Sequence, residues 1–72
     1  MERLDNILRD ILKIKSNFSE ITPETVEEWD SLNHLNLMIA IEEEFEIEVS
    51  AEDFSLLYQD YESLVIYIDE RI

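Results

Sequence analysis

Apolar residues recur at helical spacing along this chain, and this period constrains its fold more than any other feature. Near the start, five of them fall at positions i, i+3, i+4, i+7 and i+8: Leu4, Ile7, Leu8, Ile11 and Leu12. Such a stripe is typical of an amphipathic helix that covers a core. The pattern fades after Ile14, where Ser16 and Asn17 weaken the helix. On the polar side of this helix, we expect Asp5 and Arg9 to form an i, i+4 ion pair.

Three later helices are predicted to begin at side chains that can cap a helix N-terminus. Asp30 and Asp60 each offer such an oxygen, and Ser50-Ala51-Glu52-Asp53 has the form of a capping box. The apolar positions after Asp30 cover more than one stripe, so we expect a central helix with several neighbours: Leu32, Leu35, Met38, Ile39, Ile41 and Phe45. The third helix is short, with an apolar side formed by Phe54, Leu57 and Tyr58. The last is expected to bury Tyr61, Leu64, Val65, Ile68 and Ile72.

A long connection separates the first two of these helices. Residues 16–30 follow no single period, and Thr22-Pro23-Glu24 has the form of a capped turn with Pro at the first helical position. We expect the apolar side chains of this connection to pin it to the core: Phe18, Ile21, Val26 and Trp29. After Phe45, alternating apolar residues indicate an extended exit that we interpret as a loop.

These elements predict an all-α fold, a small bundle of four helices with a long loop between the first and second helices and a short third helix. Seventy-two residues allow one domain, which we place at 1–72 and expect to be monomeric. The chain has no Cys and no Gly, which excludes disulfides, thiolate metal sites and glycine-rich phosphate loops. It opens without a signal-like pattern and has no apolar run of membrane-spanning length, so we expect a soluble, cytoplasmic protein.

The charge of the chain is distributed unevenly. The formal net charge is −14 at pH 7, and residues 16–70 hold sixteen of the nineteen carboxylates without a single Lys or Arg. Such a surface repels nucleic acid and anionic membranes, so neither is expected as a partner. The charge alone leaves two interpretations open: a solvated surface, or a field that steers basic partners toward the protein.

Catalytic chemistry is poorly supplied. His34 is the single histidine and has neither a Cys nor a second His with which to hold a metal, nor a nucleophile and base arranged around it. Paired carboxylates are expected by chance in so acidic a chain, and an EF-hand would need a glycine that is absent here. We therefore expect a protein that is not an enzyme, with no catalytic residue and no metal site.

One motif stands out where the long loop meets the acidic helix, namely Glu28-Trp29-Asp30-Ser31-Leu32. Here the chain resembles the acyl carrier protein family, which includes the carriers of fatty-acid and polyketide synthesis and the related peptidyl and D-alanyl carriers. At family-like spacing the motif is followed by Leu37-Met38-Ile39-Ala40-Ile41-Glu42-Glu43-Glu44-Phe45. The likeness extends through the long loop, the step at Val49-Ser50 and Glu52-Asp53 into a short helix, and the closing helix. It covers nearly the whole chain.

The resemblance implies that Ser31 is the attachment site of 4′-phosphopantetheine, esterified through its hydroxyl by a separate phosphopantetheinyl transferase that uses coenzyme A. The thiol of this arm would carry acyl groups as thioesters between enzymes, in fatty-acid, polyketide or another specialised synthesis. Peptidyl or D-alanyl carriage is the alternative within the family. The residues agree with attachment, because the chain has no thiol of its own and the first turn of a helix favours a phosphodiester.

The resemblance also implies that acyl-loading and acyl-transferring enzymes dock on the acidic helix through basic patches. Acidic positions are kept at four residues, Asp30, Glu42, Glu43 and Glu46, whereas Asn33 and Asn36 stand where the family commonly has acids. Removing two charges from a docking surface excludes some partners, so we expect a dedicated carrier rather than one that serves the general fatty-acid synthase. Four positions correspond to an acyl-chain pocket in the family, although plain core packing explains them equally well: Leu37, Ile41, Val49 and Leu57.

Trp29 and His34 flank the motif. We expect Trp29 to anchor the loop, with its ring packed and its N–H bonded. His34 follows Ser31 by three residues on the same helix face, where we expect an exposed histidine; contact with the phosphodiester or with a partner is the alternative. A different class of function also stays open, an acidic helical interaction module without a prosthetic group. Such a module would bind a partner rich in Lys and Arg and would give Ser31 no special role.

Overall fold

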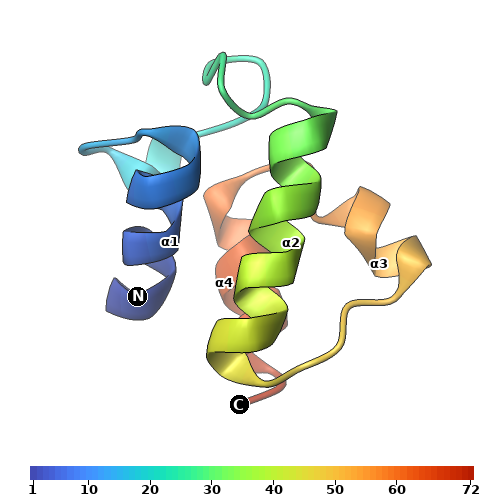
Figure 1. Cartoon of the computed structure of the whole chain (residues 1–72). Helices are drawn as coiled ribbons and strands as arrows, with labels where there is room; N and C mark the ends of the chain where they lie inside the picture. The colour runs from blue at the N-terminus through green and yellow to red at the C-terminus, as the bar shows by residue number, and fades with distance from the viewer.

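The computed structural model describes residues 1–72 and contains four α-helices, one short 3₁₀ helix and no strand (Figure 1). The elements are α1 (Glu2–Leu12), η1 (Phe18–Glu20), α2 (Ser31–Phe45), α3 (Ala51–Leu56) and α4 (Tyr61–Asp69). The prediction of a small all-α bundle with a long first connection and a short third helix is therefore confirmed. None of the helices combines the length and the apolar character that crossing a membrane requires.

Helix α1 packs along α2, α4 passes behind α2, and α3 lies on the side of α2 opposite to α1 (Figure 1). Leu4, Leu8 and Leu12 line the buried side of α1, as their spacing predicts. Helix α4 buries Leu64 and Ile68. Ile72, expected to extend that buried face, is exposed because α4 ends at Asp69.

The core consists of thirteen buried apolar side chains drawn from α1, α2, α4 and the connections: Leu4, Leu8, Leu12, Ile14, Ile21, Trp29, Leu37, Met38, Ile41, Phe45, Leu57, Leu64 and Ile68. Two of them, Ile21 and Trp29, come from the long connection, and Phe18 and Val26 pack against the cluster from the same segment. The expectation that this connection is pinned to the core is confirmed. The start of α2 at Ser31 is thereby held in one place by the burial of the loop that precedes it.

All three predicted N-caps are present. The side-chain oxygens of Asp30, Ser50 and Asp60 each accept the backbone N–H three residues later, at 2.8 to 3.1 Å. The capping box at Ser50 is only half formed, because the Asp53 carboxylate turns away from the Ser50 backbone and accepts the Tyr67 hydroxyl at 2.8 Å. Local capping signals thus fix where the helices begin, whereas a contact between helices decides where the Asp53 carboxylate of the capping box points.

Helix α2 contacts several neighbours, as expected, but it buries a single stripe, so the expectation that its apolar positions on more than one stripe meet those neighbours is wrong. The stripe consists of His34, Leu37, Met38, Ile41 and Phe45. On the other side Leu32, Leu35 and Ile39 are 67%, 44% and 46% exposed. The reason is that no other element covers the side of α2 that carries Leu32, Leu35 and Ile39, whereas His34 completes the stripe that packs against the rest of the bundle.

The ion pair expected between Asp5 and Arg9 is also absent. The Tyr61 hydroxyl donates to Asp5 Oδ1 at 2.7 Å, and Arg9 donates to Asn6 Oδ1 at 2.8 Å. A hydroxyl brought from α4 therefore replaces the charged partner on the same helix. This contact joins the start of α4 to the first turn of α1.

Candidate functional site

Ser31 is the first residue of α2, and its side chain lies on the surface. The Asp30 side chain caps the helix by accepting the Asn33 N–H at 2.9 Å, and the Asp30 carbonyl accepts the His34 N–H at 2.8 Å. No hydrogen bond within the protein occupies the Ser31 hydroxyl. Helix geometry leaves the N–H groups of Ser31 and Leu32 without an intrahelical acceptor, so donors and the positive end of a 15-residue helix surround a free hydroxyl.

Asn33 holds the loop in front of Ser31 in position. Its side-chain Nδ2 donates to the Glu28 carbonyl at 2.8 Å, and its Oδ1 accepts from Asn36 Nδ2 at 3.3 Å. An aspartate at position 33 would offer only acceptors and could not bond to that carbonyl. The amide of Asn33 is therefore needed to bond to the Glu28 carbonyl. Asn33 is also half-buried, so its side chain is not freely available to a partner.

Behind the Ser31 loop, Trp29 and His34 form a buried hydrogen-bonded pair. Both side chains are 1% exposed, and the indole N–H of Trp29 donates to His34 Nδ1 at 3.0 Å. The other imidazole nitrogen, Nε2, lies 2.7 Å from the Phe54 carbonyl oxygen. Since an indole N–H can only donate and a carbonyl can only accept, the ring is neutral and carries its proton on Nε2. The expected anchoring role of Trp29 is confirmed.

The expectation of an exposed His34 is wrong, and so is the alternative that it contacts a ligand on Ser31. The ring occupies the buried stripe of α2 and lies against Phe54 and Tyr58, with centroid separations of 4.8 and 4.7 Å. It is the only buried polar residue of the chain. Burial lowers the pKa of His34 below its usual value of 6.5, and the hydrogen bond to Phe54 opposes this in part.

The exposed side of α2 carries an apolar stripe that begins next to Ser31. Leu32, Leu35 and Ile39 follow the i, i+3, i+7 spacing of one helix face and are all exposed. Asn36, Glu43 and Glu46 are exposed and share this face by the same spacing. The result is a surface, hereafter the α2 face, in which apolar side chains beside Ser31 give way to carboxylates near the C-terminal end of the helix.

The predicted partner-binding residues separate into two groups. Asp30, Asn36, Glu43 and Glu46 are exposed, whereas Asn33 and Glu42 are half-buried and hold neighbouring backbone. Glu42 Oε2 accepts the Val49 N–H at 2.8 Å and so fixes the connection between α2 and α3 to the helix. Only the first group therefore stands free for a docking partner.

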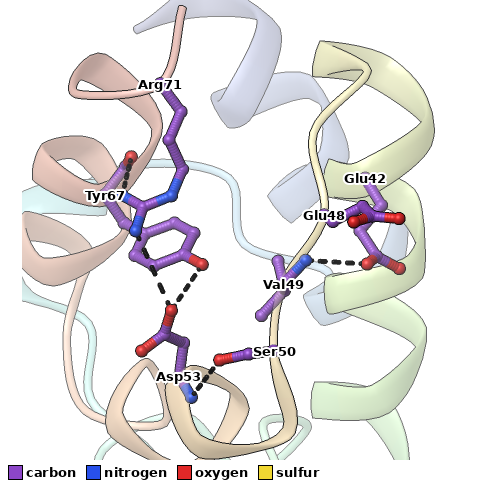
Figure 2. A pocket seen from close by; sticks show the side chains of 7 residues that line it. All are labelled: Glu42, Glu48, Val49, Ser50, Asp53, Tyr67 and Arg71. Carbon is purple, nitrogen blue, oxygen red and sulfur yellow. Dashed lines mark hydrogen bonds and ion pairs between the residues drawn. The ribbon is translucent and has the colours of Figure 1, made fainter.

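The four candidates for an acyl pocket do not line one common cavity. Leu37 and Ile41 are at most 1% exposed within the core, and Leu57 is buried beside them. Val49 lines a polar pocket of about 400 Å³ between the α2–α3 connection, α3 and α4, together with Glu42, Glu48, Ser50, Asp53, Tyr67 and Arg71 (Figure 2). A separate pocket of about 290 Å³ includes Leu57 at the α3–α4 turn.

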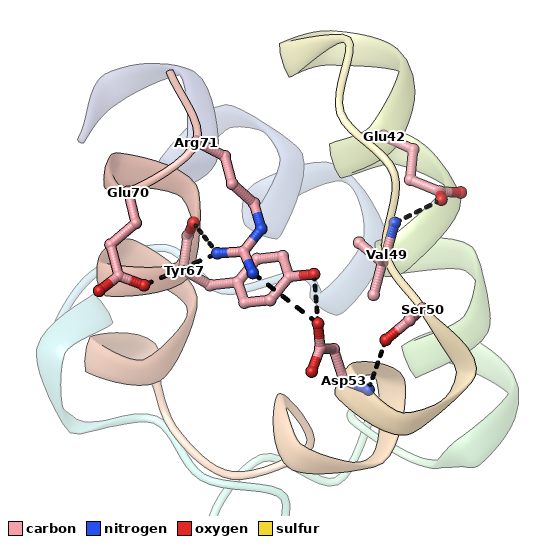
Figure 3. A network of polar contacts seen from close by, with 7 residues as sticks. All are labelled: Glu42, Val49, Ser50, Asp53, Tyr67, Glu70 and Arg71. Carbon is pink, nitrogen blue, oxygen red and sulfur yellow. Dashed lines mark hydrogen bonds and ion pairs between the residues drawn. The ribbon is translucent and has the colours of Figure 1, made fainter.

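A polar network lines the larger pocket and ties α3 to α4 (Figure 3). Asp53 Oδ2 accepts the Tyr67 hydroxyl at 2.8 Å and lies 3.8 Å from the Arg71 guanidinium, which stacks 3.4 Å from the centroid of the Tyr67 ring. Arg71 also donates to the Tyr67 carbonyl at 3.0 Å. The one basic residue after Lys15 is thus engaged at the end of the chain, away from the α2 face. No three Asp, Glu or His side chains converge to hold a metal ion.

Comparison with protein-family models, with curated proteins and with solved structures finds no match to this chain. The site therefore stands on its own geometry and on the sequence likeness given above. Sequence reasoning missed the role of Phe54 and Tyr58, which lie 20 and 24 residues after His34. The available signal was the position of His34 itself, three residues before Leu37 and seven before Ile41, where an apolar residue would complete the stripe.

Proposed function

We propose that this protein is a carrier of the acyl carrier protein type, in which the Ser31 hydroxyl is esterified by 4′-phosphopantetheine. The observation that supports it best is the placement of Ser31. It combines an exposed hydroxyl that has no partner, the N-terminal position on a 15-residue helix, and a loop held firmly behind it. At the start of α4 the residue that follows the comparable cap Asp60 is Tyr61, and Ser63 two residues later is half-buried.

The residues around Ser31 fit a phosphodiester. The free N–H groups of Ser31 and Leu32 and the positive end of the helix dipole favour its negative charge. When attached, the arm would supply the thiol that this chain lacks and would carry an acyl group as a thioester. The arm would extend into solvent, because Ser31 and Leu32 are both exposed.

The α2 face supports docking of partner enzymes on the same side as the attachment point. Leu32, Leu35 and Ile39 offer apolar contact next to Ser31, and Glu43 and Glu46 attract a basic rim farther along the helix. An apolar centre with a charged edge is the usual composition of a protein interface. Asn36 is neutral where the family commonly has an acid, so partners that need that charge bind less well. This favours a dedicated rather than a general set of partners.

The test is the intact mass of the protein after incubation with coenzyme A and a broad-specificity phosphopantetheinyl transferase. We expect the wild type to gain one phosphopantetheine, the Ser31→Ala variant to gain none, and the Ser19→Ala control, which changes another exposed serine, to gain one. Circular dichroism of all three proteins ensures that each is folded.

Failure of the wild type to gain mass, with the transferase active on a known carrier, would contradict the proposal. In that case the acidic interaction module becomes the better account, since residues 16–70 carry sixteen carboxylates and no basic side chain. Such a module should retain its partner when Ser31 is replaced by Ala.

A further inference from the structure

The Trp29–His34 pair joins three parts of the molecule that meet behind Ser31. Trp29 belongs to the loop two residues before Ser31, and His34 belongs to the first turn of α2. Through Nε2 the imidazole bonds to the carbonyl of Phe54 in α3. The Tyr58 hydroxyl, just after α3, donates to the Trp29 carbonyl at 3.0 Å and closes the connection.

This arrangement requires one protonation state of His34. The indole N–H has no acceptor other than Nδ1, and every buried polar side-chain atom of the protein has a partner. A proton on Nδ1 would place two N–H donors against each other in a region closed to water. The pair is therefore stable only while Nδ1 is a free acceptor.

Resting on the proposed function, we propose that His34 is a positioning residue for the modification of Ser31: its neutral ring holds the Trp29 loop between α2 and α3, and its protonation releases that loop. In the released state Trp29 loses its acceptor, and the segment Glu28–Asp30 that precedes Ser31 loses its main buried anchor. The transferase then meets a less ordered Ser31. Modification should therefore slow in acid because of this carrier, separately from any effect of pH on the transferase.

Few titratable or charged groups face the His34 ring. The loop places Trp29 against the ring. Phe54 of α3 and Tyr58 of the turn after α3 also lie against it. On α2 itself, the Asp30 carboxylate at the N-terminus is directed to the Asn33 N–H. No ion pair of the protein includes His34. Burial also lowers its pKa, so that the neutral ring is favoured in the folded protein.

The first arm of the test measures the pair itself, without modification of Ser31. The chain has one Trp and one His, so indole fluorescence and the imidazole nitrogen resonances each report a single residue. We expect the nitrogen shifts at neutral pH to show the Nε2–H tautomer, and Trp29 fluorescence to change on acidification with the same midpoint as His34. The His34→Asn variant keeps an acceptor near the place of Nδ1 and does not titrate, so its fluorescence should lack this transition.

The second arm measures modification in competition. Wild type and a variant are mixed in one tube with limiting transferase, and their masses are read together, so that the pH dependence of the transferase affects both equally. At neutral pH His34→Leu, which removes the acceptor but fills the site, should be modified about fivefold more slowly than wild type or slower still. His34→Asn should restore much of this rate, and its rate relative to wild type should rise as the pH falls.

The outcomes separate the two proposals. A ratio of His34→Asn to wild type that stays constant with pH, or a His34→Leu variant modified at the wild-type rate, would overturn the role of His34 while leaving Ser31 as the attachment site. No modification of the wild type at any pH would overturn the proposed function and this role together. If the nitrogen shifts place the proton on Nδ1 of His34, this result alone would overturn the role of His34, and no transferase experiment would be needed.

Discussion

The indole N–H of Trp29 donates to Nδ1 of His34 at 3.0 Å, and His34 is the only polar residue among the buried ones. A loop residue and a helix residue five positions apart thereby share one hydrogen bond in the interior. A buried donor left without an acceptor costs about 1–3 kcal/mol. Loss of this single bond would therefore remove a large fraction of the free energy of unfolding of a 72-residue domain.

Stability should fall in mild acid through His34. Its folded-state pKa lies below 6.5, so the unfolded chain binds a proton that the folded chain does not, and the free energy of unfolding falls as the pH falls below 6.5. The slope approaches about 1.4 kcal/mol per pH unit for one proton. Urea unfolding of wild type and His34→Asn across this range measures it, and equal slopes in the two proteins would contradict the assignment.

The two sides of α2 should respond very differently to truncation. Leu37 is fully buried, so Leu37→Ala should lower the free energy of unfolding by about 2–5 kcal/mol. Leu35→Ala removes the same atoms from the exposed stripe and should change it by about 0.5 kcal/mol or less. Thermal or urea denaturation followed by circular dichroism compares the matched pair. Equal losses would mean that the register of the helix is wrong.

Local signals were sufficient to predict the helices. Asp30, Ser50 and Asp60 each cap a helix as expected, because capping depends on residues three positions apart. The exposed side of α2 was not predictable in the same way. Leu32 and Ile39 have the chemistry of core residues, and only the number of neighbours around the helix decides whether they are buried.

Ser31 was predicted as the candidate site and Trp29 as its buried anchor, but the burial of His34 behind them was not predicted. The sequence likeness and the helix start predict Ser31 as the candidate, and both depend on adjacent residues. The contact of His34 with Phe54 depends on the packing of α3 against α2, which no local pattern encodes. For the same reason Asp5 bonds to Tyr61, 56 residues away, instead of to Arg9 on its own helix.

Tyr61 should make the protein sensitive to alkali. Burial, followed by the hydrogen bond to Asp5 and its charge, raises the pKa of Tyr61 from 10.0 to about 12. The stability that depends on the protonated hydroxyl is complete below 10 and is lost as the pH rises toward 12. Tyr61→Phe should cost about 1 kcal/mol at neutral pH and remove this part of the alkaline loss, as measured by urea unfolding. An alkaline loss of the same size in the variant would rule out Tyr61 as its source.

Helix α1 ends at a residue in the left-handed conformation that is not glycine. Lys13 has φ 59° and ψ 26°, a region that costs a side chain about 1 kcal/mol relative to glycine. Lys13→Gly should therefore raise the free energy of unfolding by up to about 1 kcal/mol. The control Lys15→Gly removes the same charge from an exposed residue with negative φ and should be neutral or destabilising. A gain in the control but not at Lys13 would contradict the role of this conformation.

The central claim, attachment at Ser31, is tested most directly on a peptide. Cleavage after glutamate at Glu28 and Glu42 releases residues 29–42, in which Ser31 is the only hydroxyl-bearing side chain. After treatment of the folded protein with coenzyme A and the transferase, its mass should increase by one phosphopantetheine, and fragmentation should place the group on Ser31. An unmodified 29–42 peptide, from a reaction in which a known carrier is fully converted, would contradict the account.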